Sequence, residues 1–250
     1  MTSAAEISSA PQPMCSEHPD RAAVRTCERC GRYVCTDCVR EDGRCPECIQ
    51  KSVGAIPRSE ARSRRAVLFL QLAGGLAAVS LLLNVWTVAA PGEDAVRDFL
   101  EGLTAIVSLG VLVTAPIVYL MWLHRVVRQL NALGVDVGAT PGWAVGYWFI
   151  PFVNLVKPFR VLRSIVVELG DEALAASLQL SAWWAMLLLA RILGRIEGRM
   201  VMQNGWDGPV PIKAYFVGIG SSLCTIIAAI LCVRIVREVQ GRLDARRGDL

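Results

Sequence analysis

The sequence lacks most of the signatures by which catalytic sites are recognised. It has only two histidines in 250 residues, and it contains no Gly-x-Ser-x-Gly elbow, no His-Glu-x-x-His pair and no Walker sequence. Acidic residues are absent from the centres of its long apolar runs, which argues against a proton-coupled carrier and against a carboxylate-based intramembrane enzyme. We therefore expect a protein that is not an enzyme.

The start of the chain lacks the features of a signal peptide. Residues 1–14 are small and polar, without the basic start and apolar core that such a peptide needs. We interpret them as a disordered leader and expect the first internal apolar run to direct membrane insertion. The net charge of +4 comes without a basic patch interleaved with aromatic residues, so we expect no nucleic-acid partner.

Cysteine, in contrast, is concentrated in one short stretch. Seven of the nine cysteines lie between Cys15 and Cys48, together with His18. They form four pairs, each with a gap of two residues: Cys15 and His18, Cys27 and Cys30, Cys35 and Cys38, Cys45 and Cys48. Such a gap lets both side chains reach one metal ion, and zinc takes four sulfur or imidazole ligands in a tetrahedron. Eight ligands therefore predict two closed sites, which are structural rather than catalytic.

The spacing leaves two pairings open, sequential and interleaved. We favour interleaving, because the short link between Cys30 and Cys35 makes it hard for both flanking pairs to turn onto one metal with room for a core. Site one would then hold Cys15, His18, Cys35 and Cys38, and site two Cys27, Cys30, Cys45 and Cys48. Tyr33 and Val34 are expected to form the small apolar core, and metal binding to supply most of the stability.

Three other uses of these cysteines fit less well. A disulfide framework needs an oxidising compartment, an iron–sulfur cluster usually takes four cysteines, so that His18 and the extra pairs fit poorly, and a redox Cys-x-x-Cys normally occurs once. The stretch "CSEHPDRAAVRTCERCGRYVCTDC" resembles a B-box-type zinc finger, a family whose members use cross-braced pairing and mediate protein contacts. The usual B-box ends with histidines, whereas this module ends with Cys45 and Cys48.

The remainder of the chain is rich in long apolar runs. A linker at 49–65 ends in a basic cluster, and charge-free runs follow at 66–90, 102–123, 173–190 and 214–233. These runs have about the length that a membrane-spanning helix needs. We expect an all-α polytopic membrane domain over 66–240, followed by a basic tail at 241–250. Gly74 and Ala78 form a small-xxx-small pattern that suits close helix packing.

A fifth apolar run, at 137–157, carries too many glycines and prolines for a straight helix. We interpret it as an interfacial or re-entrant element with a kink at Pro151, and whether it spans, re-enters or lies on the surface stays open. Asn154 would bond carbonyl groups freed by the kink or, alternatively, line a polar path.

The same region resembles a bacterial membrane family known as domain of unknown function 4328. The stretch "GWAVGYWFIPFVNLVKPFRVLRSI" carries the resemblance, with "LMWLHRVVRQLNALG" before it and "SAWWAMLLLARIL" after it. Its characteristic residues here are Trp143, Trp148, Pro151, Asn154 and Pro158. The resemblance covers about 66–240 and implies a polytopic membrane domain with no activity to carry over.

Basic residues indicate how the chain is oriented. Four spans place most of them, including those before residue 66 and after residue 233, on the cytoplasmic side together with both termini. Arg191, Arg195 and Arg199 then fall on the outer side. We expect a cell-membrane protein whose partners are the lipid bilayer and a protein that binds the zinc module. Alternatives are a small transporter or channel regulated by the finger, and a lipid-acting enzyme that uses the three arginines. The sequence leaves the oligomeric state open.

Overall fold

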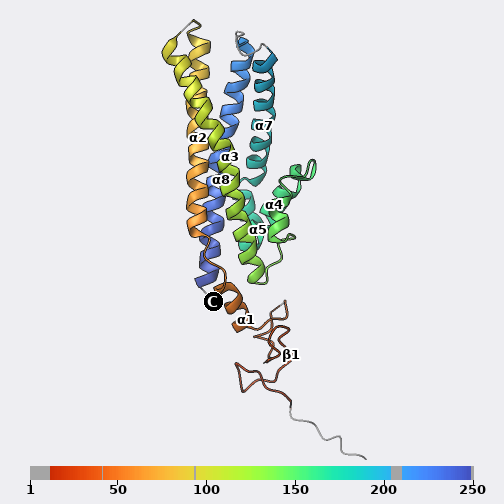
Figure 1. Cartoon of the computed structure of the whole chain (residues 1–250). Helices are drawn as coiled ribbons and strands as arrows, with labels where there is room; N and C mark the ends of the chain where they lie inside the picture. Colours follow the sequence, from red (N-terminus) through yellow and green to blue (C-terminus); the bar gives the residue numbers. More distant parts are fainter. Residues whose placement is uncertain (1–11, 41, 93, 204–209, 249–250) are drawn as a thin grey trace, which may run out of the picture. The chain divides into compact units, whose positions relative to one another are not determined.

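The structure is a computed structural model, and it describes residues 12–40, 42–92, 94–203 and 210–248. Most of the leader expected at 1–14 lies outside these residues. The chain divides into two compact units, the first made of residues 1–57, 129–136 and 250, and the second of 58–128 and 137–249 (Figure 1). Each unit is described by itself below.

Unit 1 contains very little regular structure. Strands β1 (Arg25–Thr26) and β2 (Tyr33–Val34) pair antiparallel, with Arg25 opposite Val34, and helix α1 covers Pro46–Gly54. Because neighbouring residues of a strand point to opposite faces, Val34 is buried while Tyr33 is 48% exposed. The prediction that Tyr33 belongs to the core is therefore wrong. The buried cluster consists of Val34 and six cysteines.

Residues 129–136, which include the last turn of helix α3 (Ala95–Ala132), belong to this unit. Arg44 Nη2 donates to the carbonyl oxygens of Asn131 and Ala132, at 3.4 and 3.1 Å, and Ser52 Oγ donates to the Ala132 carbonyl at 3.2 Å. The last carbonyls of a helix have no partner within the helix, and a cation there also interacts favourably with the helix dipole. Arg44 and Ser52 thus cap this helix end.

Unit 2 is built around long helices. It contains four long helices: α2 (Glu60–Ala89), α3, α7 (Leu180–Gln203) and α8 (Ile212–Gly248). Helix α8 runs antiparallel to α2 and to α7. Four candidate spans, at Glu60–Ala89, Ala95–Ala132, Glu172–Gln203 and Ile212–Gly248, are long and apolar enough to cross a membrane. The prediction of a polytopic helical domain with four spans is confirmed at this level, although each helix extends beyond its charge-free run.

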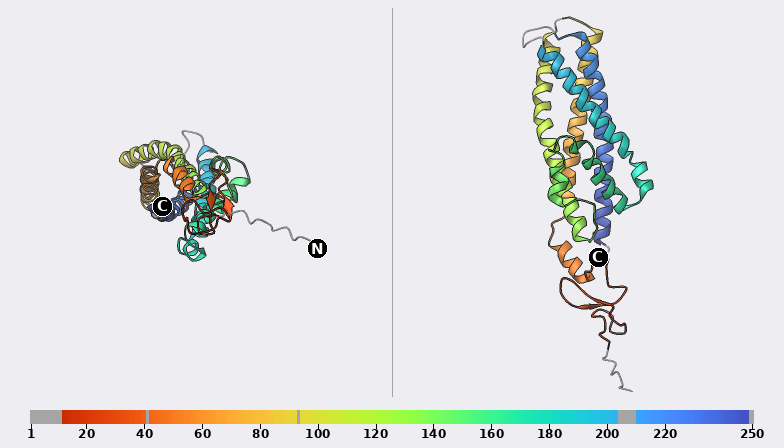
Figure 2. Two further views of the ribbon diagram at one scale, coloured as in Figure 1. Left: turned by 90° about the horizontal axis from the view of Figure 1, so that it is seen from below. Right: turned by 90° about the vertical axis from the view of Figure 1, so that its right-hand side faces the viewer.

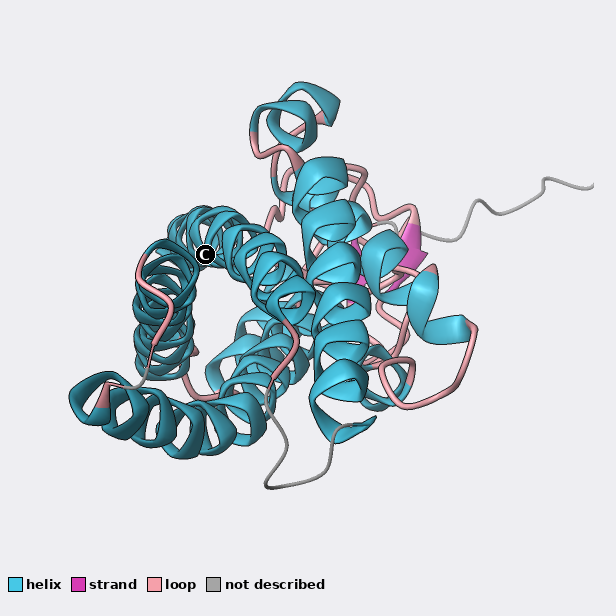
Figure 3. Cartoon of the chain, turned by 90° about the horizontal axis from the view of Figure 1, so that it is seen from above, coloured by secondary structure: helices cyan, strands magenta, loops and turns pink. Residues whose placement is uncertain are grey.

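Figures 2 and 3 show the long helices side by side in a bundle. Small residues let α8 approach α2 and α7 closely. A Cβ atom on Gly74 of α2 would meet the Ala229 Cβ of α8 at 3.1 Å. On the other side, a Cβ on Gly194 of α7 would meet Ser221 Oγ at 3.5 Å, and Ser221 Oγ donates to the Ala190 carbonyl at 3.4 Å. Because lipid does not drive membrane helices together as water does in soluble proteins, such close packing contributes much of their association. These contacts also fix the register of the three helices.

The fifth apolar run is broken into short pieces. Helix α4 covers only Pro141–Gly146, where Thr140 Oγ1 accepts from the Trp143 amide, and the 3-10 turn η1 covers Val153–Leu155. Phe152 lies between them with a φ of 64°, so no continuous helix passes Pro151. The chain then continues as α5 (Lys157–Leu169) and α6 (Glu172–Ser177). None of these helices reaches the roughly 20 residues that a span requires.

The contact between α2 and α8 gives a test of this packing. Gly74→Val should push these two helices apart, because its side chain would meet the Cβ of Ala229, which cannot rotate away. Overpacking of this kind costs about 1–3 kcal/mol. The measurement is the free energy of unfolding in detergent.

Gly75→Val is the matched control, since a Cβ on Gly75 meets nothing within 4 Å. Both variants make the same chemical change in the same helix, so their difference isolates the contact. Equal stabilities for the two variants would contradict the packing described here.

Candidate metal centres

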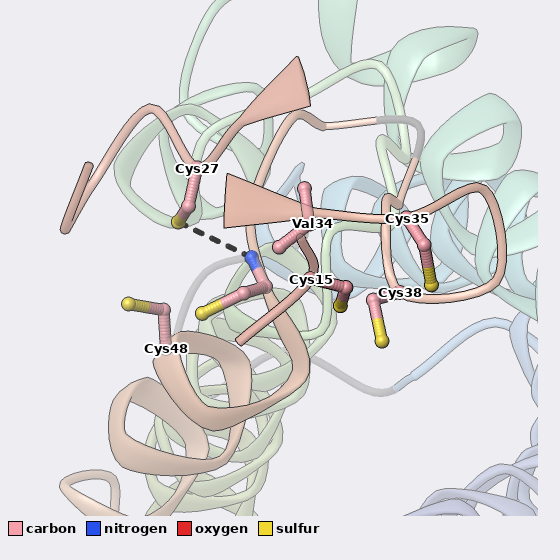
Figure 4. Close-up of a cluster of buried hydrophobic side chains, with 7 residues drawn as sticks. Cys15, Cys27, Val34, Cys35, Cys38 and Cys48 are labelled. Carbon is pink, nitrogen blue, oxygen red and sulfur yellow. Dashed lines mark hydrogen bonds between the residues drawn. The ribbon is translucent and has the colours of Figure 1, made fainter. Parts of the chain in front are cut away.

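The first group of ligands combines the first and the third of the four pairs along the chain. Cys15, His18, Cys35 and Cys38 each offer one ligand atom, and these atoms all lie within 4.8 Å of one another. His18 Nδ1 is 4.0 Å from Cys15 Sγ, 3.5 Å from Cys35 Sγ and 3.2 Å from Cys38 Sγ. The three cysteines of this group are buried, and Figure 4 shows their sulfur atoms.

The second group combines the other two pairs, so the structure brings the eight side chains together in the interleaved order. Cys27, Cys30, Cys45 and Cys48 also hold their sulfur atoms within 4.8 Å of one another, and Cys30 Sγ is 3.8 Å from Cys45 Sγ. The Cys45 amide donates to Cys27 Sγ at 3.3 Å, the dashed contact in Figure 4. Cys30 is the one exposed cysteine of this group.

These distances fit a tetrahedral ion. Zinc–sulfur bonds of about 2.3 Å give a tetrahedron with edges of roughly 3.8 Å. The separation of Cys30 and Cys45 matches that edge, and the three His18 distances scatter around it. Four ligands fill each tetrahedron, so neither group leaves a position open for substrate.

Local backbone geometry explains how each pair is formed. After Cys30 the chain turns at Gly31, whose φ of 75° suits glycine and whose amide donates to the Cys27 carbonyl at 2.8 Å. The Cys38 amide donates to the Cys35 carbonyl at 3.1 Å in a similar turn. Cys45 is the N-cap residue of α1, and Cys48 lies in its first turn. Tight turns and a helix start thus bring the two members of these three pairs together.

The electrostatics of the two groups also favour a bound cation. Desolvation raises the pKa of Cys15 and Cys27, but backbone amides outweigh it and the pKa of each falls to about 6. Desolvation and then the neighbouring thiols raise the pKa of Cys38 and of Cys48 to about 12. Each group therefore holds at least one thiol that ionises easily and at least one that resists ionisation. A metal ion supplies the positive charge that lets all of them bind as thiolates.

The characteristic residues of the membrane domain lie close together along the broken segment. Trp143 stacks on Tyr147 with a centroid distance of 5.5 Å, and Trp148 lies edge-on to Tyr119 and Trp184, at 5.7 and 5.8 Å. Pro158 is buried at the start of α5, where its missing amide costs nothing. Asn154 lies in η1, where its backbone N–H donates to the Ile150 carbonyl. Pro151 lies in the turn that precedes η1.

The packing of α7 against α8 corrects one expectation. A Cβ on Gly218 of α8 would meet Glu197 Oε1 of α7 and Asn84 Nδ2 of α2, at 2.5 and 2.9 Å. Gly194 faces Ser221, so residues 182–201 of α7 lie level with the charge-free run 214–233 of α8. Arg191, Arg195, Arg199 and Glu197 therefore lie level with the charge-free run of α8, and Glu197 lies near the end of that run and not at its centre.

Four spans and two groups of cysteine and histidine ligands define a multi-pass helical membrane protein with an N-terminal module that can hold two metal ions. The chain belongs to the family described as Domain of unknown function (DUF4328), whose model matches residues 87–241, more than half of the chain. The match excludes most of α2 and the whole cysteine-rich module. No curated protein and no solved structure matches the chain.

Proposed function

We propose that two structural zinc ions fold the N-terminal module, and that this module binds a protein partner or regulates the membrane domain. The observation that supports the proposal best is the interleaved grouping of eight ligand atoms into two sets. Zinc suits these sets because it prefers thiolate sulfur and imidazole nitrogen and takes four of them. The resemblance of the module to B-box-type zinc fingers, a family that mediates protein contacts, also supports a role in binding a protein partner.

The same ligand count supports a role in binding over one in catalysis. A catalytic zinc keeps one position for water or substrate, whereas each set here supplies four protein ligands. We place the module in the cytoplasm, together with both chain termini, because reduced thiols are maintained there. Its surface carries ion pairs, Arg21 with Asp37 and Arg32 with Glu47, which leave a charged, hydrophilic face around the metal sites.

Metal analysis tests the proposal directly. Full-length protein purified without chelator should contain about two zinc ions per chain, because each ligand set fills one tetrahedron. Inductively coupled plasma mass spectrometry gives the metal identity and the ratio. Protein that carries no zinc, or that carries iron instead, would contradict the assignment.

A comparison of captured partners tests the role of the module. Wild-type protein and Cys27→Ser protein would each be isolated from membranes under mild detergent. A partner that binds the module should be lost from the variant, while a partner of the membrane domain should stay with both. A set of partners that does not change would oppose a recruitment role.

A small transporter or channel regulated by the finger is the second candidate. The observation in its favour is the presence of Arg191 and Glu197 within the span, because ionisable groups at this depth mark ligand or ion paths in many membrane proteins. A lipid-acting enzyme would need an acid or nucleophile beside the arginines. The side chain that the structure places against Arg191 is Trp148, which supplies neither.

A further inference from the structure

Arg191 lies level with the middle of the charge-free run of α8. The charge-free run of α8 covers 214–233, and its centre falls between residues 223 and 224. Gly194 faces Ser221 across the antiparallel pair, so Arg191, three residues earlier in α7, lies level with Cys224. Arg195 and Arg199 follow at intervals of four residues and lie progressively closer to the helix end.

The charge of Arg191 has little compensation within unit 2. No carboxylate in the described part of the chain forms an ion pair with Arg191. The neighbouring charge that acts on it is the positive charge of Arg195, which repels it. Its guanidinium lies over the Trp148 ring, 6.0 Å from the centroid. A cation–π contact contributes less free energy than the placement of an arginine at the centre of a span costs. The tryptophan alone therefore does not balance the charge.

Two buried hydrogen-bond donors lie in the same aromatic cluster. The Tyr119 hydroxyl has no partner among the described residues, and the Tyr119 side chain is only 5% exposed. The indole N–H of Trp148 is buried and also has no partner among them. The neighbouring tryptophans differ, since Trp122 donates to Gln240 Oε1 and Trp184 to the Leu155 carbonyl, at 3.2 and 2.9 Å.

Buried donors without an acceptor are rare because each costs the free energy of desolvation. Tyr119 lies edge-on to the Trp148 ring and Arg191 lies over it, so a positive charge, an O–H and an N–H belong to three side chains that meet at this ring. All three favour an acceptor, and the charge favours an anion. Arg191 is exposed on the surface of unit 2 at the level of the apolar run, and Phe149 and Phe152, close to Trp148 in the sequence, are 72% and 84% exposed. A ligand that arrives here must carry an apolar chain.

We propose that the Trp148 cluster, defined by Tyr119, Trp148 and Arg191, binds the acidic headgroup of an acyl-chain amphiphile. A carboxylate or phosphate oxygen accepts from the Tyr119 hydroxyl and the Trp148 indole while its charge neutralises Arg191. The acyl chain lies along the exposed apolar surface. Free fatty acids and phosphatidic acid share this chemistry. The site is independent of the metal centres and of the role proposed for them.

The test uses full-length protein in nanodiscs of neutral phosphatidylcholine, with radiolabelled oleate as the probe. Arg191→Gln should weaken oleate binding at least tenfold. Arg199→Gln, two helical turns along the same face, is the matched control and should leave binding unchanged. Arg191→Lys keeps the charge and should retain most of the affinity, which also guards against a folding defect.

Tyr119→Phe supplies a second readout that a purely structural role would not produce. Removal of an unpartnered buried hydroxyl should leave the ligand-free protein equally stable or raise its unfolding temperature, because a desolvation cost is lost. The same change should weaken oleate binding several-fold, because one donor is lost. A variant that is less stable and binds oleate normally would assign the hydroxyl to packing.

Competition separates the two possible sources of the headgroup. Displacement of oleate by phosphatidic acid supports a lipid phosphate as the natural ligand, and failure to displace it supports a free carboxylate. Equal competition by oleyl alcohol would overturn the proposal, because it would show that the acid is not recognised. Equal losses in Arg191→Gln and Arg199→Gln, or no oleate binding at all, would overturn it as well.

Discussion

Cys27→Ser is expected to unfold the N-terminal module while the membrane helices remain intact. The core of this module is Val34 with the buried cysteines, which is far too little apolar surface to offset the entropy of folding. The free energy of metal binding therefore supplies the stability, and for structural zinc it amounts to about 10–16 kcal/mol per ion in small domains. Loss of one thiolate ligand breaks a closed site and with it the fold of residues 15–48.

Limited proteolysis is the direct measurement. Trypsin should cut the variant more rapidly than the wild type at Arg25, Arg29 and Arg32, because these arginines are exposed but the folded module holds their backbone in a strand, a tight turn and a backbone hydrogen bond. The zinc content should also fall by at least one ion per chain. Cys224→Ser is the matched control, because Cys224 is also buried but belongs to neither ligand group. A Cys27→Ser protein with protected arginines would show that the module folds without this ligand. Loss of helical circular dichroism in that variant would show that the two units do not fold independently.

Gln240→Leu is expected to produce the largest loss of stability in unit 2. Gln240 Oε1 accepts from Ser59 Oγ at 2.9 Å and from the Trp122 indole at 3.2 Å, and Gln240 Nε2 donates to Asp244 at 2.9 Å. Ser59, Trp122 and Gln240 are all buried. Leucine has nearly the same volume but no acceptor, so the buried Trp122 indole loses its acceptor and Ser59 loses one hydrogen bond. At about 1–3 kcal/mol for the stranded indole and about 0.5–1.5 kcal/mol for the lost Ser59 hydrogen bond, the loss is roughly 2–4 kcal/mol.

Gln71→Leu provides the control for this substitution. Gln71 is exposed on α2, so the same chemical change there removes no buried contact and should leave the stability nearly unchanged. The measurement is the unfolding free energy in mixed micelles, followed by helical circular dichroism. If both leucine variants were equally stable, the contacts of Gln240 would have no net energetic value.

The cysteine-rich module was predictable because its information is local. Two-residue gaps identify the pairs, and the short link between Cys30 and Cys35 favours the interleaved order that the structure places together. Tyr33 was misplaced because the apolar character of a residue does not reveal which face of a two-residue strand it occupies. Pairing through β1 turns Val34 inward and Tyr33 outward.

The membrane domain was predictable in outline but not in depth. Charge-free runs gave four spans, and proline and glycine gave the break near Pro151. The register of α7 against α8 was not predicted, because the charge-free run 173–190 alone indicates a different apolar part for this helix. In the structure Gly194 and Gly218 set the register, and this places Arg191 and Glu197 level with the apolar run of α8. Contacts between distant helices, such as Tyr119 with Trp148, leave no periodic signal in one sequence.

The interleaved order of the ligands would make the binding of two metal ions cooperative. Site one draws together the ends of 15–38 and site two the ends of 27–48, so the segment 27–38 lies within both loops. Each ion that binds restricts the chain between the ligands of the other and reduces the entropy cost of closing the second loop. The module should accordingly fill in nearly one step, with little of the form that carries a single ion.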